Sequence, residues 1–307
     1  MRTALRLDPS PMLRLPVLVF LVSLVIQGTS ADPSHGSSSS LKLAIPIDTD
    51  SPAAWSEAIA GAPLVGIIVL NPSNGPGQSV DANYAQLVYE AQAKGIKVIG
   101  YVYTQWANGN VSVAQAEGWI DKYYSWYHVD GIMLDEANDS CDRAPLNFYA
   151  DLYSYAKDEP GHAIVLLNPG EATGECYAAV SDVLLTFEND YADYLRGYVG
   201  DAWTDSFSPG HFFHIVFDVP TVAEMEAVIS TAIARGVGWV YVTDLDNSNG
   251  NPYSSLPSYF DRELAYVGGL DRQRPTYPAA MPVMLILGFV VAGSVLVVVK
   301  GRKRVSD

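Results

Sequence analysis

Short apolar segments that stop at turn-forming residues recur eight times between residues 41 and 243 of this 307-residue chain. Segments with helical periodicity lie between several of them, and such alternation predicts a parallel sheet. We expect strands over 41–48, 64–70, 96–102, 132–134, 162–167, 182–187, 212–217 and 237–243, and helices over 81–94, 112–127, 143–157, 221–234 and 256–266. Eight such units fit a single-domain α/β fold, the (β/α)8 TIM barrel, which typically has ~250 residues. A doubly wound open sheet is the alternative, disfavoured because no Gly-rich phosphate-binding fingerprint follows any strand.

The fourth of these segments ends in two adjacent carboxylates, Asp135 and Glu136. An apolar run of this kind predicts a strand buried on both faces, and α/β folds place their active sites at the carboxyl ends of such strands. Neighbouring residues of a regular strand point to opposite sides, so only one of the pair can face the site. We expect Asp135 to be that residue. The alternative interpretation is that one of the two merely caps the following helix.

Polar residues also end the other predicted strands, at the edge where a barrel brings all strand ends together. They are Asp48, Asn71, Tyr103, Asn168, Glu188 and Asp244. Several carboxylates that share a cleft repel one another, so at least one of them should have a raised pKa, as a general acid beside a nucleophile requires. Trp106 and Tyr253, in Asn-, Gly- and Pro-rich loops, offer flat apolar faces to sugar rings. Each residue alone has an ordinary alternative as a cap, turn or packing residue, but together they predict a carbohydrate site.

Other chemistries are poorly supported by the sequence. The chain has 34 acidic and 18 basic residues and a net charge of −16, which disfavours nucleic acid as a partner. It contains no HExxH, GxSxG or phosphate-loop motif. Residues 244–251 resemble a calcium loop only faintly, because the glycine is one position late and Ser255 stands where a bidentate Glu is needed. We therefore expect no metal, no cofactor and a monomeric protein.

Both ends of the chain carry apolar segments outside the barrel pattern. Three arginines, an apolar run and small residues at 29–31 are typical of a cleaved signal peptide over 1–31, with an uncleaved anchor as the alternative. Near the other end, 281–299 is apolar without a charge, which predicts a transmembrane helix followed by a basic cytoplasmic tail over 300–307. The alternative is a buried core helix. We expect a Ser-rich leader over 32–40, the barrel over 41–270 and a stalk over 271–280, and hence a single-pass cell-surface protein with an extracellular domain.

Two cysteines, Cys141 and Cys176, fall in loops predicted to leave the same face of the sheet. Outside the cell such thiols tend to pair, and two thiols alone do not make a structural zinc site. Asn110 and Asn138 each begin a glycosylation acceptor pattern. We expect Asn138 to be unmodified, because a glycan two residues beyond Glu136 would crowd the cleft.

Five segments carry a resemblance to a known family. IMLDE at 132–136, LLNPG at 166–170, TFE at 186–188, VLNPSNGPG at 69–77 and YVTDLDNSNGNPYSSLPSYF at 241–260 resemble the spherulin-4 family. The resemblance covers about residues 43–260 and implies a barrel glycoside hydrolase. Characterised relatives cleave α-1,4-linked N-acetylgalactosamine in galactosaminogalactan, using an Asp-Glu pair after strand four and a Glu after strand six. Those positions match Asp135, Glu136 and Glu188 here.

The sequence thus leads to one main functional hypothesis and two alternatives. The main hypothesis is a membrane-tethered extracellular glycoside hydrolase, endo-acting on an N-acetylgalactosamine-containing polysaccharide. On this hypothesis Glu188 is the general acid/base, Asp135 is the nucleophile or electrostatic stabiliser, and Glu136 has a supporting role. Asp48, Asn71, Tyr103, Trp106, Asn168, Asp244 and Tyr253 are the expected sugar contacts. The alternatives are a non-catalytic glycan-binding protein at the cell surface and a structural protein with a vestigial site.

Overall fold

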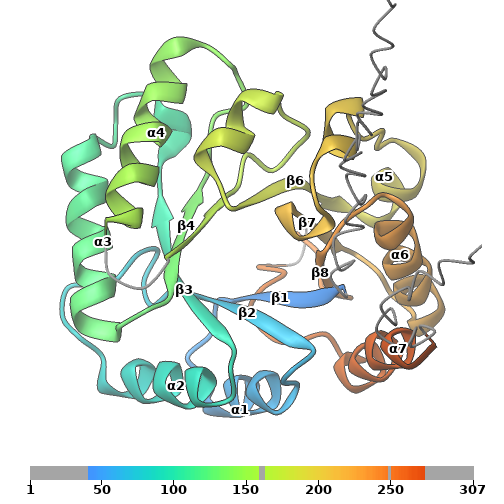
Figure 1. Ribbon diagram of the computed structural model, residues 1–307. Coiled ribbons are helices and arrows are strands. Elements are labelled where there is room, and N and C mark those ends of the chain that lie inside the picture. The colour runs from blue at the N-terminus through green and yellow to red at the C-terminus, as the bar shows by residue number, and fades with distance from the viewer. Residues whose placement is uncertain (1–40, 159–162, 248–249, 274–307) are drawn as a thin grey trace, which may run out of the picture. The chain divides into compact units, whose positions relative to one another are not determined.

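The computed structural model describes residues 41–158, 163–247 and 250–273. In this part of the chain, eight parallel strands form a closed barrel in which each strand pairs with the next in sequence and β8 pairs with β1 (Figure 1). The strands are β1 Lys42–Ile47, β2 Val65–Leu70, β3 Lys97–Tyr103, β4 Gly131–Asp135, β5 Ile164–Leu167, β6 Val183–Asp190, β7 Phe212–Phe217 and β8 Trp239–Val242. The predicted barrel is confirmed, and the open-sheet alternative is wrong.

Helices surround the barrel and connect its strands. They are α1 Pro52–Ala60, α2 Ala82–Ala93, α3 Val113–Tyr127, α4 Arg143–Lys157, α5 Tyr191–Arg196, α6 Val222–Ala234 and α7 Phe260–Gln273, with short 3-10 helices at Gln105–Ala107, Glu175–Val180, Ala202–Ser206 and Pro209–His211. Side-chain caps fix several of their starts, since Ser51, Asp81 and Ser112 each accept a hydrogen bond from a first-turn backbone N–H.

Four elements differ from the sequence prediction. The helices α1 and α5 were not expected, although Ser51 followed by Pro52 is a helix-start signal, and α5 has only six residues, too few to show a periodicity. Strand β6 extends to Asp190, so Glu188 lies within the strand and not after it, because its pairing with β7 continues past a bulge. Helix α7 begins at Phe260, later than expected, and continues to Gln273, which places the first residues of the predicted stalk in a helix.

The core lies inside the barrel and between the barrel and its helices. Branched aliphatic residues such as Ile45, Ile67 and Ile99 are fully buried on the strands. Glycine allows one close contact of the helical layer: a Cβ on Gly100 would lie 2.4 Å from the ring of Tyr123, whose hydroxyl donates to a backbone oxygen of β2. The rigid barrel therefore fixes the strand ends that carry the candidate site.

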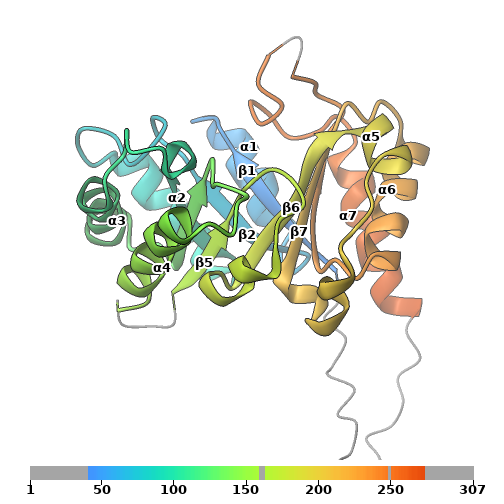
Figure 2. The same cartoon turned by 90° about the horizontal axis from the view of Figure 1, so that it is seen from above.

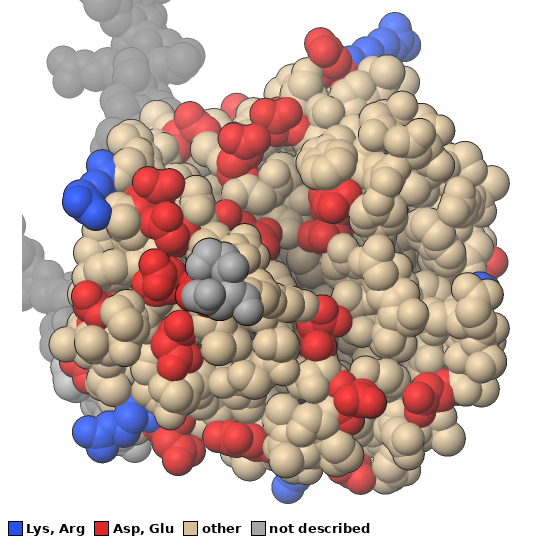
Figure 3. All heavy atoms as spheres, turned by 180° about the vertical axis from the view of Figure 1, so that it is seen from behind, with Lys and Arg blue, Asp and Glu red and all other residues tan. Residues whose placement is uncertain are grey.

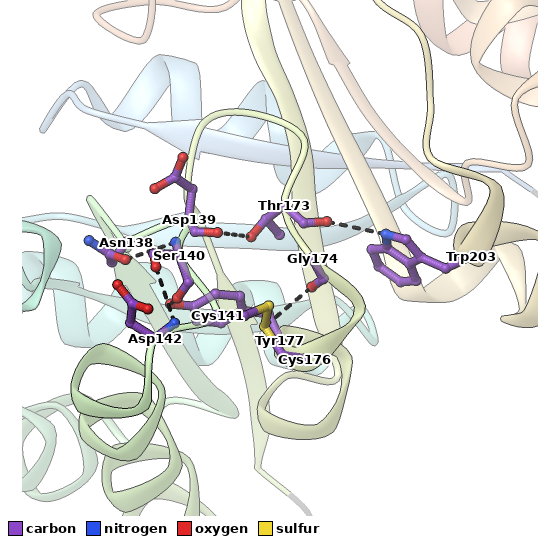
Figure 4. The surroundings of a disulfide bond; sticks show 10 residues. All are labelled: Asn138, Asp139, Ser140, Cys141, Asp142, Thr173, Gly174, Cys176, Tyr177 and Trp203. Carbon is purple, nitrogen blue, oxygen red and sulfur yellow. Dashed lines mark hydrogen bonds between the residues drawn. A yellow bond between two sulfur atoms is a disulfide. The ribbon is translucent and has the colours of Figure 1, made fainter.

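The two cysteines form a disulfide, the pairing that the sequence leaves open (Figure 4). It joins the loop that follows β4 to the loop that follows β5, over a sequence separation of 35 residues. A Cβ on Gly174 would lie 2.4 Å from the Cys141 sulfur, so only glycine fits beside the bridge. The same loops are joined by hydrogen bonds from Thr173 Oγ1 to the Asp139 carbonyl and from the Tyr177 hydroxyl to the Ser140 carbonyl.

Several sequence predictions fall on residues that the structure does not describe. These are the signal peptide over 1–31, the leader over 32–40, most of the stalk, the transmembrane helix over 281–299 and the tail over 300–307. Among the helices within 41–273, none has the length and apolar character needed to span a bilayer.

Candidate active site

A cavity of about 500 Å³ opens at the carboxyl ends of the strands. We call it the central cavity; its lining includes Asp48, Asn71, Tyr101, Asp135, Asn168, Glu188, Asn251 and Tyr253. Figure 3 shows this face of the molecule, where acidic residues surround a central hollow and Lys and Arg appear only towards the outline. The loop between β8 and α7 rises above the same face in Figure 2. Six of the ten residues that the sequence assigns to a site, Glu188 among them, thus line one cavity.

Asn168 joins the two carboxylates at the floor of the central cavity. Its amide nitrogen donates to Asp135 Oδ1 at 2.6 Å and to Glu188 Oε2 at 2.7 Å. These two oxygens are therefore at most about 5.3 Å apart, the sum of the two distances. Separations of ~5 Å occur in glycosidases that use one carboxylate as nucleophile, whereas ~6.5–9.5 Å leaves room for an inverting water.

The turn at 168–170 orients this amide. Asn168 Oδ1 accepts a hydrogen bond from the Gly170 N–H at 2.8 Å, so the amide nitrogen must point to the acids. Gly170 has φ +77°, which an L side chain rarely adopts, and its carbonyl accepts from the Glu188 N–H at 3.0 Å. The Asn-Pro-Gly sequence thereby fixes both the bridging side chain and the backbone of the residue that it bridges to.

Each carboxylate also accepts a hydrogen bond from its own tyrosine. Tyr101 of β3 donates its hydroxyl hydrogen to Asp135 Oδ2 at 2.7 Å. Tyr253, in the loop between β8 and α7, donates to Glu188 Oε1. Each acid therefore accepts one hydrogen bond from the shared amide of Asn168 and one from the hydroxyl of its own tyrosine.

The environment shifts the acid–base properties of this pair. Burial raises the pKa of Asp135, while the hydrogen bonds from Tyr101 and Asn168 oppose that rise. Burial and then the negative charge of Asp135 raise the pKa of Glu188, against hydrogen bonds from Tyr253 and Asn168. Two carboxylates this close repel each other when both are ionised, so the pair favours holding one proton between them over carrying two charges.

A third carboxylate lines the central cavity together with the two acids. Asp48, directly after β1, accepts hydrogen bonds from the side-chain amides of Asn71 at 3.4 Å and of Asn251. The backbone N–H of Asp48 donates to the Tyr253 carbonyl at 2.9 Å. These contacts tie the β8–α7 loop to the end of β1 and hold a charged acceptor beside the paired acids.

Glu136 does not line the central cavity. Its φ of 49° turns the chain away after Asp135, and its Oε2 is buried without a hydrogen-bond partner among the described residues. Burial, followed by the charge of Asp135, raises the pKa of Glu136. Its carbonyl accepts hydrogen bonds from Thr104 Oγ1 and from the Trp106 N–H, so its backbone is bound to the loop that follows β3.

Three further residues expected to contact sugar are absent from the cavity lining. Tyr103 bonds instead to the Gln105 side chain. Trp106 is 50 % exposed and lies in a turn of three consecutive left-handed residues, 105–107. Asp244 Oδ1 accepts from the Ser258 N–H at 3.0 Å and fastens the start of the β8–α7 loop to its end. Asp244 is thus not among the residues that line the central cavity with Asp135 and Glu188.

The sequence analysis did not assign two residues of the cavity lining to the site, because it looked for polar residues directly after each strand. Tyr101 lies inside β3, two residues before its end, and Asn251 lies in the middle of a long loop. Strand alternation offers a signal for Tyr101, because it shares a face with Tyr103. No local pattern marks Asn251, whose position depends on the path of the whole loop.

A model of the spherulation-specific family 4 matches residues 46–267 of this chain. The chain belongs to this family. Spherulin-4 of Physarum polycephalum, which carries the family's name, is 29% identical to this chain over 259 residues. The alignment covers 80% of this chain and 74% of spherulin-4. The matched residues include all those named above in the lining of the central cavity, from Asp48 to Tyr253. The resemblance stated from the sequence is therefore confirmed.

Solved structures of other proteins superpose on the barrel of this chain. Aspergillus clavatus Sph3, determined in complex with GalNAc, superposes with a TM-score of 0.65 at 22% identity and covers 75% of this chain and 98% of its own. A chitinase from Chromobacterium violaceum superposes with a TM-score of 0.50 at 11% identity, covering 76% of this chain and 100% of its own. At these identities the likeness shows a shared barrel fold.

Proposed function

We propose that this family 4 protein is a glycoside hydrolase that uses Glu188 as general acid/base and Asp135 as nucleophile. The observation that carries the proposal is the single amide of Asn168 that donates to both carboxylates. It keeps the acids at a separation suited to a retaining reaction. Glu136 has a supporting role, holding the backbone of the adjoining loop through its carbonyl.

The proposed reaction has two steps. In the first, Glu188 gives its proton to the glycosidic oxygen while Asp135 attacks the anomeric carbon; the bond to the leaving sugar breaks and a glycosyl ester on Asp135 forms. In the second, Glu188 removes a proton from water, which attacks the anomeric carbon and releases Asp135. Tyr101 and Asn168 stabilise Asp135 whenever it carries a negative charge, because both donate to its oxygens.

The proposed substrate is a polysaccharide containing N-acetylgalactosamine, cut within the chain. The complex of the related Sph3 with GalNAc supports the choice of sugar, and the cavity at the centre of a broad, open face supports internal cleavage. Asp48, Asn71 and Tyr253 are proposed sugar contacts from the cavity wall. Tyr103, Trp106 and Asp244 stay outside this set, since they do not line the cavity.

The proposal places the barrel outside the cell as a monomer. Residues 281–299 serve as its membrane anchor and 1–31 as its signal peptide, on the sequence pattern alone.

Incubation of the protein with a panel of amino-sugar polymers tests this function. Release of reducing ends from an N-acetylgalactosamine polymer, with the α configuration kept in the first product seen by NMR, is the expected result. Binding of the polymer without any release of reducing ends would favour the non-catalytic glycan-binding protein. Release of the β anomer would retain the hydrolase and reject Asp135 as nucleophile.

A further inference from the structure

A second cavity, of about 310 Å³, lies where α1 and α2 begin. We call it the α1–α2 cavity; its wall includes Asp50 and Pro52 before and in α1, and Asn83, Tyr84 and Leu87 in α2. These helices follow β1 and β2, so their first turns lie on the same face of the barrel as the central cavity. Nothing in the proposed reaction uses this second cavity.

The two cavities are neighbours across the segment that leaves β1. Asp48 lines the central cavity, and Asp50, two residues later, lines the α1–α2 cavity. Burial and the nearby charges of Asp50, Asp81 and Asp48, in that order, raise the pKa of Tyr84 to about 12. The Tyr84 hydroxyl therefore lies within electrostatic reach of carboxylates from both cavities and stays protonated as a donor at physiological pH.

The lining of the α1–α2 cavity has the mixed character that a sugar unit requires. Asp50 and Asn83 offer acceptors and amide hydrogens to hydroxyl groups, whereas Pro52 and Leu87 offer apolar contact to a C–H face. Helix capping explains one acid of the wall, since Asp81 accepts from the Asn83 N–H at 2.8 Å. It does not explain Asp50, because Ser51 is the cap of α1.

Charge limits the kind of sugar. Carboxylates line both cavities, and no Lys, Arg or His is among the described residues of either lining. A sugar that carries a carboxylate or sulfate would meet repulsion here, while a neutral or amino-bearing sugar would not.

We propose that the α1–α2 cavity is an outer subsite, which binds one non-acidic sugar unit of the polymer whose scissile bond lies in the central cavity. The inference rests on the proposed function. A polymer cut within its chain must leave the central cavity along the rim, and the short segment from Asp48 to Asp50 contributes to the linings of both cavities.

Chain-length dependence tests the subsite. Oligosaccharides of increasing length, prepared from N-acetylgalactosamine polymer, are assayed with the wild type and with Asp50→Asn and Asn83→Ala. In the wild type, kcat/KM rises at the length that first fills the outer subsite. Each variant is expected to lower kcat/KM by up to about tenfold on longer oligosaccharides, mostly through KM, because one or two hydrogen bonds are lost. The shortest cleaved oligosaccharide should lose no more than about twofold, since it does not reach the cavity.

Asp151→Asn and Asn147→Ala are matched controls, because both residues are exposed on α4, away from the two cavities. Calorimetric affinity for the same oligosaccharides separates this inference from the proposed function. If no oligosaccharide is cut but affinity still rises with length only in the wild type, the hydrolase proposal fails and the subsite stands. If cleavage occurs and the rise is identical in wild type and variants that melt normally, the subsite is rejected.

Discussion

Tyr253 donates a hydrogen bond to Glu188, which fastens the loop between β8 and α7 to the end of β6. In the same way, the hydroxyl of Tyr101, within β3, donates a hydrogen bond to Asp135. A hydrogen bond to a carboxylate stabilises its ionised form and lowers its pKa. The two tyrosines therefore act on different acids, and a pH profile can separate them.

Tyr101→Phe removes a donor from Asp135, so the pKa of that carboxyl should rise further. Because the nucleophile must be ionised, the acidic limb of the kcat/KM profile should move to higher pH. Tyr253→Phe removes a donor from Glu188, and the alkaline limb, which reports loss of the acid's proton, should move to higher pH instead. The acids interact, so each variant is judged by the limb that moves more. Equal movement of both limbs in both variants would reject the separate assignment.

Asn168→Ala should affect both acids at once, since it removes the donor that they share. Both limbs of the pH profile should move to higher pH, and kcat should fall by about 10²-fold as the pair loses its fixed separation. Asn147→Ala on the surface of α4 is the control. An Asn168→Ala enzyme with normal melting and an unchanged profile would show that the bridging amide has no part in catalysis.

The stability of the protein should also depend on Glu188. Burial raises its pKa in the folded state above the unfolded value of ~4.3, so the folded protein retains this proton longer. The contribution of protonated Glu188 to the free energy of unfolding is complete below the pKa of the unfolded state. It is lost as the pH rises through the pKa of the folded state. Glu188→Gln, which cannot ionise, should therefore melt at a higher temperature than the wild type at pH 7, with the difference shrinking near pH 4. Glu57→Gln, at an exposed position of α1, should show no such trend.

The disulfide should contribute to stability more than to chemistry. It closes a loop of 35 residues, and loops of that length lose about 2–4 kcal/mol of unfolding free energy when the bridge is removed. Denaturant titration of the Cys141→Ser, Cys176→Ser double variant measures this loss. Activity below the new melting transition should stay close to that of the wild type, as neither sulfur lines the central cavity. A variant as stable as the wild type would contradict this account.

The fold was predictable because each strand is short, apolar and bounded by turn residues, and the pattern repeats until the barrel closes. Strand β6 shows where this reasoning stops. The residues after Phe187 are polar, so the sequence ends the strand there, whereas pairing with β7 continues to Asp190. Polar residues at a barrel rim face a solvent-filled cavity, and hydrophobic periodicity does not detect them.

The candidate site was predictable to the extent that its residues end strands. Asp135 and Asn168 follow that rule, whereas Glu188 follows only the apolar part of β6, and the turn at Gly170 links Asn168 to Glu188. Asp244 obeys the same rule but is used to fasten its own loop. Trp106 was misplaced because it lies in a turn of three consecutive left-handed residues, none of them glycine, which the sequence does not predict. Loop paths depend on contacts between distant segments, such as Asn251 with Asp48, that local sequence does not encode.

The central claim is that Asp135 and Glu188 together cleave a glycosidic bond. Its most direct test is the rate of reducing-end release from an N-acetylgalactosamine polymer by Asp135→Asn and Glu188→Gln, with Asp151→Asn and Glu57→Gln as controls. Each site variant should melt at or above the wild-type temperature and lose at least about 10²–10⁴-fold in rate, while the controls keep full activity. If both variants fold and still cut at close to the wild-type rate, the claim is contradicted. If Glu136→Gln abolishes cleavage and Asp135→Asn does not, the nucleophile is Glu136.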